Sequence, residues 1–335
     1  AMESVRPLWA TALAAENLAE TDETALTAAL AAGDCALLRY HGAIPLSIVS
    51  GWMGGRQTSG IAAETMLYAA GTGQLFVRDG AGALYAAPVQ VDESVLAAAQ
   101  EGFRGANCRF AGADYAVYPE TLLFEGETLS LPLLTAEPIS LFDPQSGAGL
   151  ENLLDAFGFT AYTNYYSDPS DRVRVFVDDV STLRVGATGL LQYAAGEDGT
   201  VRAYDDGEAS GRAALDAQID CARLILDAAV RAGETDTHTS LYAVEQDDSR
   251  TTLVFMQMFG GVPVLGDSDF AVFTFERGSL TSATVHLTRF AAQETRALVL
   301  PAMQAAAGAS GEQARGLMTA YRLTDGVYVP GRFYL

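Results

Sequence analysis

The stretch from Thr252 to Val285 has the most regular pattern in the chain, with apolar residues that recur at alternate positions. Because successive side chains point to opposite faces of a β-strand, this spacing predicts strands with one buried face. Two short segments interrupt the pattern, Gly260–Gly261 and Arg277–Gly278. We expect a hairpin around the second. At the first we expect a bent or bulged strand at a sheet edge, because Pro263 follows and proline cannot donate to a sheet ladder.

The rest of the chain mixes helical periodicity with further hairpin patterns. The segment Thr21-Asp22-Glu23-Thr24 offers N-cap residues before an Ala- and Leu-rich run, and Gly33 follows the run, which is typical of a capped helix. The residues from Arg212 to Ala232 carry apolar side chains at helical spacing. We expect helices over residues 23–32, 93–103, 150–158, 212–232 and 294–308, a strand over 238–246, and hairpins turning at 79–80, 125–127 and 197–199. In the segment 294–308, Pro301 either begins a helix or kinks one.

Two polar, glycine-bearing joints predict three domains. The joints are the segments "DPQSGAGL" and "DDGEASG". They separate an N-terminal α+β domain (3–145), a middle helix-on-sheet domain (146–207) and a C-terminal domain (208–335). The last two repeat one layout, a helix followed by strands and a glycine-containing hairpin. We therefore predict the α+β class, with tandem domains of antiparallel sheet covered by one or two helices.

The composition excludes two classes of partner. Acidic residues outnumber basic ones by 42 to 20, which gives a formal net charge of -22. Such a field repels nucleic acid and anionic lipid head groups, so we expect neither as a partner. Hydrophobic residues make up 49% of the 335 residues and charged ones 19%, which indicates globular domains with buried cores.

The residue types that carry catalysis form no known motif. His41, His238 and His286 stand in separate segments, without the spacing of a zinc or non-haem iron site. Ser50 and Ser59 lie among glycines, but no base can be assigned to either. The chain has no lysine for a phosphate loop, and its three cysteines are far apart. We therefore expect no enzyme activity, no cofactor and no metal.

Two groups of residues are candidates for contact with a partner. Trp52 and Arg56 flank the start of a glycine-rich segment that extends to Gly60. Tyr165 and Tyr166 lie in the middle domain, and exposed aromatic rings can stack on sugars or on side chains. We assign all four residues to candidate interaction sites.

The segment "FMQMFGGVPVLGDSDFAVFTFERGSLTSATV" resembles a pattern in the YycH and YycI proteins, extracytoplasmic regulators of Gram-positive bacteria, and more loosely the PepSY-like modules. The pattern is filled by Phe255, Gln257, Phe259, Gly261, Pro263, Val264, Gly278 and Leu280. The segment "LMTAYRLTDGVYVPGRFYL" is similar to the closing hairpin of that family, with Tyr321, Val329 and Pro330 in place. Phe333 stands where the family has Trp, one residue later. The resemblance covers residues 150–335, and its motifs specify hairpins and packing.

This resemblance implies a non-enzymatic, extracytoplasmic protein that is held to the cell membrane by an N-terminal anchor outside this sequence. Its expected partner is a sensor histidine kinase of a cell-wall-related two-component system, or a paralogous regulator. Two alternatives stay open. One is a surface-anchored binding module for a peptide or a cell-wall glycan, and the other is an atypical hydrolase built around Ser50 or Ser59.

Overall fold

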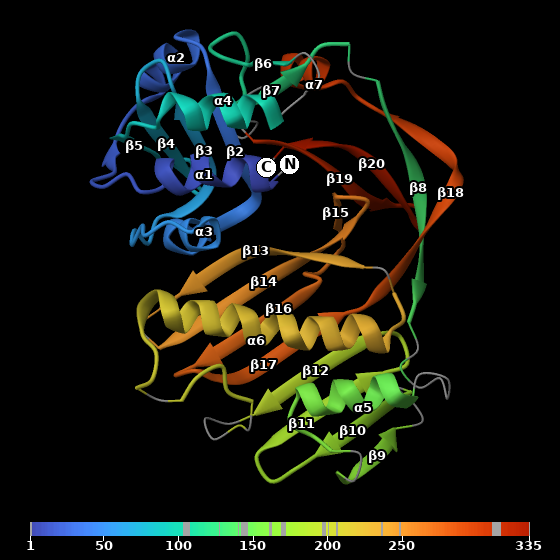
Figure 1. The fold of residues 1–335 in the computed structure, drawn as a ribbon. Coiled ribbons are helices and arrows are strands. Elements are labelled where there is room, and N and C mark those ends of the chain that lie inside the picture. The colour runs from blue at the N-terminus through green and yellow to red at the C-terminus, as the bar shows by residue number, and fades with distance from the viewer. Residues whose placement is uncertain are drawn as a thin grey trace. The chain divides into compact units, whose positions relative to one another are not determined.

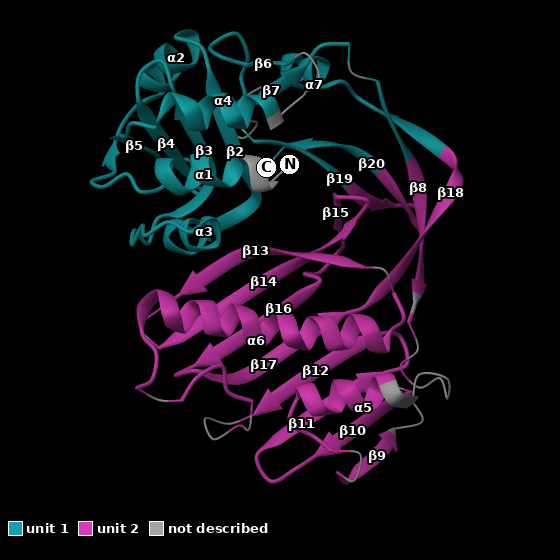
Figure 2. Cartoon of the chain, viewed as in Figure 1, with its two compact units in different colours: residues 1–131, 296–320, 330–335 teal, residues 132–295, 321–329 magenta. Residues whose placement is uncertain are grey.

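The computed structural model describes residues 2–102, 108–126, 128–139, 141, 147–160, 163–168, 172–195, 199, 201–205, 207–235, 237–247, 249–309 and 316–334. The chain is a mixed α+β protein with antiparallel sheets, 24% helical and 45% strand, which confirms the predicted class. It divides into two compact units (Figure 2). Unit 1 comprises residues 1–131, 296–320 and 330–335, and unit 2 comprises residues 132–295 and 321–329. The division into domains 3–145, 146–207 and 208–335 stays a prediction.

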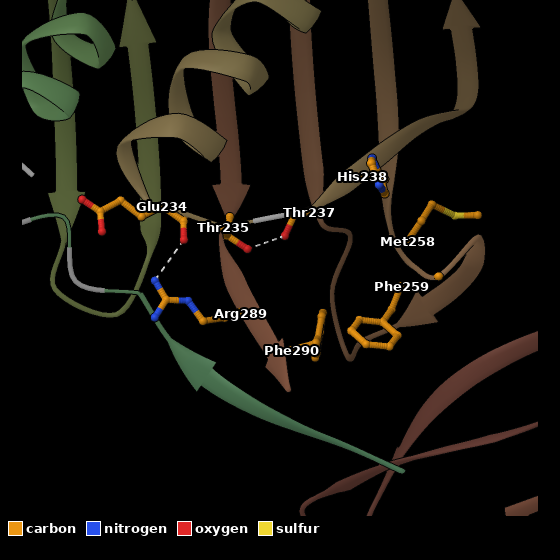
Figure 3. A pocket seen from close by; sticks show the side chains of 9 residues that line it. Glu234, Thr235, Thr237, His238, Met258, Phe259, Arg289 and Phe290 are labelled. Carbon is orange, nitrogen blue, oxygen red and sulfur yellow. Dashed lines mark hydrogen bonds between the residues drawn. The ribbon is translucent and has the colours of Figure 1, made fainter. Parts of the chain in front are cut away.

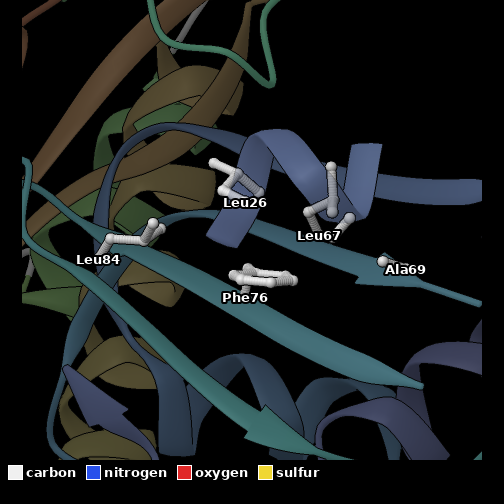
Figure 4. Close-up of a cluster of buried hydrophobic side chains, with 6 residues drawn as sticks. Leu26, Leu67, Ala69, Phe76 and Leu84 are labelled. Carbon is white, nitrogen blue, oxygen red and sulfur yellow. The ribbon is translucent and has the colours of Figure 1, made fainter. Parts of the chain in front are cut away.

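Unit 1 is built on a five-stranded antiparallel sheet in the order β1-β5-β4-β3-β2 (Figure 1). Its strands are β1 (Ala19–Glu20), β2 (Cys35–Pro45), β3 (Ala62–Ala69), β4 (Gln74–Asp79) and β5 (Leu84–Pro88). Helix α2 (Glu23–Ala31) begins where the Asp22 carboxylate accepts a hydrogen bond from the Ala25 amide at 2.9 Å. Leu26 on this helix packs with Leu67, Phe76 and Leu84 of the sheet (Figure 4). Burial of these side chains holds the helix to the sheet.

The other helices of unit 1 pack among themselves and on a small second sheet. They are α1 (Met2–Ala12), α3 (Leu46–Met53), α4 (Glu93–Gly102) and α7 (Ala302–Gly308). Strand β6 (Cys108–Phe110) pairs with β7 (Leu122–Phe124), and α7 contacts β7. The predicted hairpin at residues 125–127 is therefore wrong. Strand β7 pairs with the preceding strand β6 and not with the following strand β8 (Leu129–Pro138). Strand β8 lies between β18 and β20 in another sheet.

Unit 2 contains two antiparallel meanders, each of which follows a helix in the chain. The first set is α5 (Gly147–Ala156), β9 (Tyr165–Asp168), β10 (Val173–Val177), β11 (Ser181–Gly186) and β12 (Leu190–Ala195). The second set is α6 (Gly211–Ala232), β13 (His238–Gln246), β14 (Arg250–Phe259), β16 (Ala271–Glu276) and β17 (Ser279–His286). Strand β15 (Val262–Leu265) follows β14 and pairs with it in a hairpin, and β16 pairs with another part of β14. Because β12 pairs with β17, the two meanders form one continuous sheet, and α5 contacts α6 (Figure 1).

The double glycine is a hairpin turn, and the expected bent edge strand is wrong. Gly260 and Gly261 have φ values of 57° and 82°, the positive pair that a tight two-residue hairpin turn requires. Phe259 consequently faces Val262 across the turn. Strand β15 also pairs in parallel with β19, so it lies inside the sheet. Glycine is needed here because an L side chain rarely adopts this backbone.

Four strands have residues in both units: β8, β18 (Thr288–Val299), β19 (Leu317–Thr324) and β20 (Val327–Tyr334). Strand β18 contradicts the helix expected over residues 294–308. The chain stays extended to Val299, and a helix begins only after Pro301, which occupies the N-cap of α7. Alanine and leucine favour helix locally, but strand pairing decides the conformation of this segment.

Candidate functional site

Unit 2 has a pocket where α6 ends and where strands β13 and β18 begin (Figure 3). Its volume is about 320 Å³, within the range of small-molecule sites. The lining residues are Glu234, Thr235, Thr237, His238, Met258, Phe259, Gly260, Arg289 and Phe290. They combine a polar wall after the helix with an apolar wall from β14 and β18.

The end of α6 places the first part of the polar wall. Glu234 has φ of 47°, and the Thr235 amide donates to the Val230 carbonyl at 3.3 Å, so the chain turns sharply after the helix. Arg289 Nη2 donates to the carbonyls of Gly233 and Glu234, both at 3.2 Å. A cation at this position complements the negative end of the helix dipole. The Glu234 carboxylate is turned away from the aromatic rings (Figure 3).

A buried glutamine positions the second part of the polar wall, the hydroxyls of Thr235 and Thr237. Gln257 is 4% exposed, and its Nε2 donates to Thr237 Oγ1 at 2.9 Å and to the Thr288 carbonyl at 2.7 Å. Both amide hydrogens are therefore used, which sets the orientation of the side chain. Thr237 Oγ1 also lies 2.8 Å from Thr235 Oγ1, within hydrogen-bond distance. A chain of hydrogen bonds thus runs from the core to the pocket wall.

Two aromatic rings form the apolar wall, and each is held by an edge contact. Phe259 meets Tyr321 with ring centroids 6.1 Å apart and planes at 89°. Phe290 meets Tyr328 at 5.0 Å and 76°. Burial, and then the Asp267 carboxylate, raise the pKa of Tyr328, so its phenol is neutral at ordinary pH. Edge-to-face pairs of this kind restrict ring motion and favour a preformed pocket.

Only part of the family-like pattern reaches this pocket. Phe259 lines it, and Gln257 supports the threonines from behind. Phe255 is buried against Phe273, with ring centroids 5.8 Å apart. Tyr321 is 1% exposed and supports the Phe259 ring.

The remaining pattern residues have backbone or packing roles. Gly261 is in the turn before β15, and Pro263 is buried in that strand opposite Met258. Gly278 lies in the turn between β16 and β17, and Pro330 is buried in β20.

The four candidate interaction residues lie outside the pocket. Trp52 is half-buried on α3, with its ring 6.4 Å from that of Tyr40, and Arg56 is exposed in the loop that follows. Both belong to unit 1. Tyr165 and Tyr166, each 58% exposed, lie on β9, and the sheet order of unit 2 separates that strand from β14 and β18.

The serine and histidine residues considered as catalytic candidates lie in different surroundings. Ser50 is fully buried, and its Oγ accepts a hydrogen bond from the Gln57 amide at 3.1 Å. Burial, with a smaller effect of Arg39, lowers the pKa of His41, so this ring is neutral at pH 7. His238 lines the pocket of unit 2. In the part of the chain that the structure describes, no three His, Cys, Asp or Glu side chains are grouped to hold a metal ion.

Sequence reasoning missed most of the pocket. From the sequence we predict no role for Thr235, Thr237, Arg289 or Phe290. The available signal was a Thr-x-Thr spacing directly after a helix end, which places two hydroxyls on one side of an extended segment. Such spacing is common, so only the fold distinguishes it.

Comparisons of the chain with protein-family models, with curated proteins and with solved structures find no match. No helix among the described residues is both long and apolar enough to cross a bilayer. The geometry of the pocket is therefore the main basis for a functional proposal.

The three thiols are expected to differ in reactivity. Burial, and then the Asp34 carboxylate, raise the pKa of Cys35 to about 11, and burial raises that of Cys221 to about 11. At pH 8 roughly one part in a thousand of each is thiolate, the reactive form. Cys108 is exposed, so iodoacetamide should label it first. Mass spectrometry of timed samples checks this order, with all three thiols equally reactive in denaturant. Labelling of Cys221 as fast as Cys108 would contradict it.

Proposed function

We propose that this chain is a non-enzymatic regulatory protein that binds a small ligand or a peptide end in the pocket of unit 2. The observation that carries the proposal is the construction of that pocket. Its hydroxyls are positioned by a buried glutamine, its guanidinium is bound to a helix end, and its two rings are fixed by edge contacts. Preformed polar groups beside apolar surface are typical of ligand sites.

We propose further that binding is coupled to a partner, a sensor histidine kinase or a paralogous regulator on the extracytoplasmic side of the membrane. Support comes from the family-like pattern, since Phe259 lines the pocket and Gln257 positions its hydroxyls. A ligand that stabilises one state of the complex would bias the activity of the kinase.

The test is capture from native membranes followed by measurement of function. Bound proteins are identified, and autophosphorylation of any captured kinase is measured with and without this protein. We expect a kinase whose activity changes on addition of the protein. Absence of a kinase among the captured proteins, or an unchanged rate of autophosphorylation, would refute the regulatory role. Ligand binding in the pocket of unit 2 would then be tested separately.

The second candidate is a surface-anchored binding module for a peptide or a cell-wall glycan, which the aromatic wall of the pocket favours. Phe259 and Phe290 offer ring surface to a side chain or a sugar. Thermal-shift measurements with muropeptides and oligosaccharides separate the two kinds of ligand, because only a bound ligand raises the melting temperature.

We also propose that the two helix-and-meander sets of unit 2 are tandem repeats of one layout. Each has a helix followed by antiparallel strands, and their last strands, β12 and β17, pair with each other. Expression of the second set alone, residues 211–286, is a direct test, since an independent repeat should give a cooperative unfolding transition.

A further inference from the structure

We infer that the pocket of unit 2 selects a carboxylate carried on an apolar or aromatic group. The inference rests on the proposed ligand-binding function and specifies the chemistry of the ligand. It follows from three features of the pocket: a leftover hydroxyl hydrogen, a guanidinium and an aromatic wall.

The hydroxyl hydrogen follows from the hydrogen-bond inventory. Thr235 and Thr237 have one hydroxyl hydrogen each, and one of the two is used in the bond between their Oγ1 atoms, whichever atom donates. The other cannot go to Gln257, because the contacting atom is the amide nitrogen, which only donates. No other described residue accepts the second hydroxyl hydrogen, so the pocket wall can donate a hydrogen bond to a ligand as well as accept one.

The guanidinium supplies further donors and a positive charge. Arg289 uses Nη2 for the two carbonyls at the end of α6, and no other described residue forms a hydrogen bond or ion pair with its Nε or Nη1. The side chain is exposed, so these donors are accessible from solvent. Arginine donors match the geometry of a carboxylate, and a charge-assisted bond is about twice as strong as a neutral one. One guanidinium and one hydroxyl suit a single negative charge.

The apolar wall specifies what carries the carboxylate. Met258, Phe259 and Phe290 line the pocket with a thioether and two rings. The rings are held by Tyr321 and Tyr328, so they are positioned before a ligand arrives. An aromatic or branched aliphatic group would bury its surface there, which adds affinity beyond that of the carboxylate. A C-terminal phenylalanine and a free aryl-alkanoic acid share this chemistry.

A matched set of probes tests the inference on the unmodified protein. N-acetylphenylalanine is compared with its primary amide, which keeps the ring and removes the charge. A tripeptide ending in phenylalanine with a free carboxylate is compared with 4-phenylbutyrate, to distinguish a peptide end from a small acid. Calorimetric titration gives each affinity. We expect the acid to bind at least about tenfold more tightly than the amide, as loss of a charged hydrogen bond predicts.

Two variants with the same charge change locate the site. Arg289→Gln should weaken binding of the acid about tenfold or more, whereas Arg109→Gln, at an exposed arginine in unit 1, should leave it unchanged. Circular dichroism establishes that each variant is folded. If Arg289→Gln is not folded, Phe290→Leu replaces it, and loss of affinity for the aromatic acid is expected because the ring contact is removed.

The outcomes are distinct. Preference for the acid over the amide, lost in Arg289→Gln, supports the inference. Equal affinity for acid and amide, or unchanged affinity in Arg289→Gln, overturns it. Tighter binding of an uncharged probe than of the acid in this pocket also overturns it but leaves the proposed ligand-binding function standing. Failure of every acid, amide and sugar probe overturns the inference and counts against that function as well.

Discussion

Replacement of Arg78 by methionine is expected to destabilise unit 1 by about 3–5 kcal/mol, the cost of leaving a buried charge without its partner. Arg78 is 1% exposed, and its guanidinium binds both oxygens of Glu120, at 2.6 and 2.9 Å, and both oxygens of Glu23, at 2.8 and 3.0 Å. It also lies 3.9 Å from the centre of the Tyr118 ring. Burial by itself lowers the pKa of Arg78, but the two carboxylates more than offset this and raise it. Arg78 is therefore charged at every accessible pH.

The measurement uses the two tryptophans, Trp9 and Trp52, because both belong to unit 1. Urea unfolding followed by their fluorescence should show a large decrease in midpoint for Arg78→Met. The control is Arg109→Met, since Arg109 is 43% exposed and 3.7 Å from Asp114, and such a pair contributes about 1 kcal/mol or less. Equal stability of the two variants would show that the buried network does not stabilise unit 1. In the double variant Arg78→Met/Glu120→Leu we expect much of the loss to be recovered, because no uncompensated charge stays buried.

Nothing in the sequence near Arg78 predicts this network. Glu23 precedes it by 55 residues and Glu120 follows it by 42, so their meeting depends on how α2 and the turn before β7 pack on the sheet. The acidic excess of the chain offers many carboxylates for each arginine, and charge counting cannot select a pair. Long-range partners of a buried side chain follow from topology, which local pattern does not specify.

Local signals did predict several elements correctly. Asp22 caps α2, the helix over 212–232 is α6, and the strand over 238–246 is β13 with the same bounds. These segments have caps or periodicities that their own residues determine. The errors lie at β7, at the double-glycine turn and at β18. Strand β7 pairs with the preceding β6, the turn joins β14 to β15, and β18 pairs with β8 from a distant part of the chain. The pocket was missed for the same reason, because Thr235, Phe259 and Arg289 come together only when β13, β14 and β18 are in place.

Gly278→Ala is expected to destabilise unit 2 by about 3–4 kcal/mol, through a positive backbone angle and a steric overlap together. Gly278 has φ of 83° in the turn between β16 and β17, and a Cβ there would lie 2.7 Å from the Tyr204 carbonyl oxygen. That carbonyl cannot shift easily. The Ala203 amide donates to the Gly278 carbonyl at 2.8 Å, and the Leu280 amide donates to the Val201 carbonyl at 2.9 Å. The segment that ends at Tyr204 is thus hydrogen-bonded along the turn that the new methyl group would push against.

The matched control is Gly261→Ala, in the turn before β15. Gly261 has a similar φ of 82°, but no atom lies within 4 Å of the position of its Cβ. This variant should therefore be destabilised only by the cost of placing alanine at a positive φ, about 1–2 kcal/mol. Thermal unfolding followed by far-UV circular dichroism compares the two variants. If they lose the same stability, the overlap with Tyr204 is relieved at no cost and the turn is held by its backbone angle alone. A clearly larger loss for Gly278→Ala identifies the packing of residues 201–204 as what requires glycine at this turn.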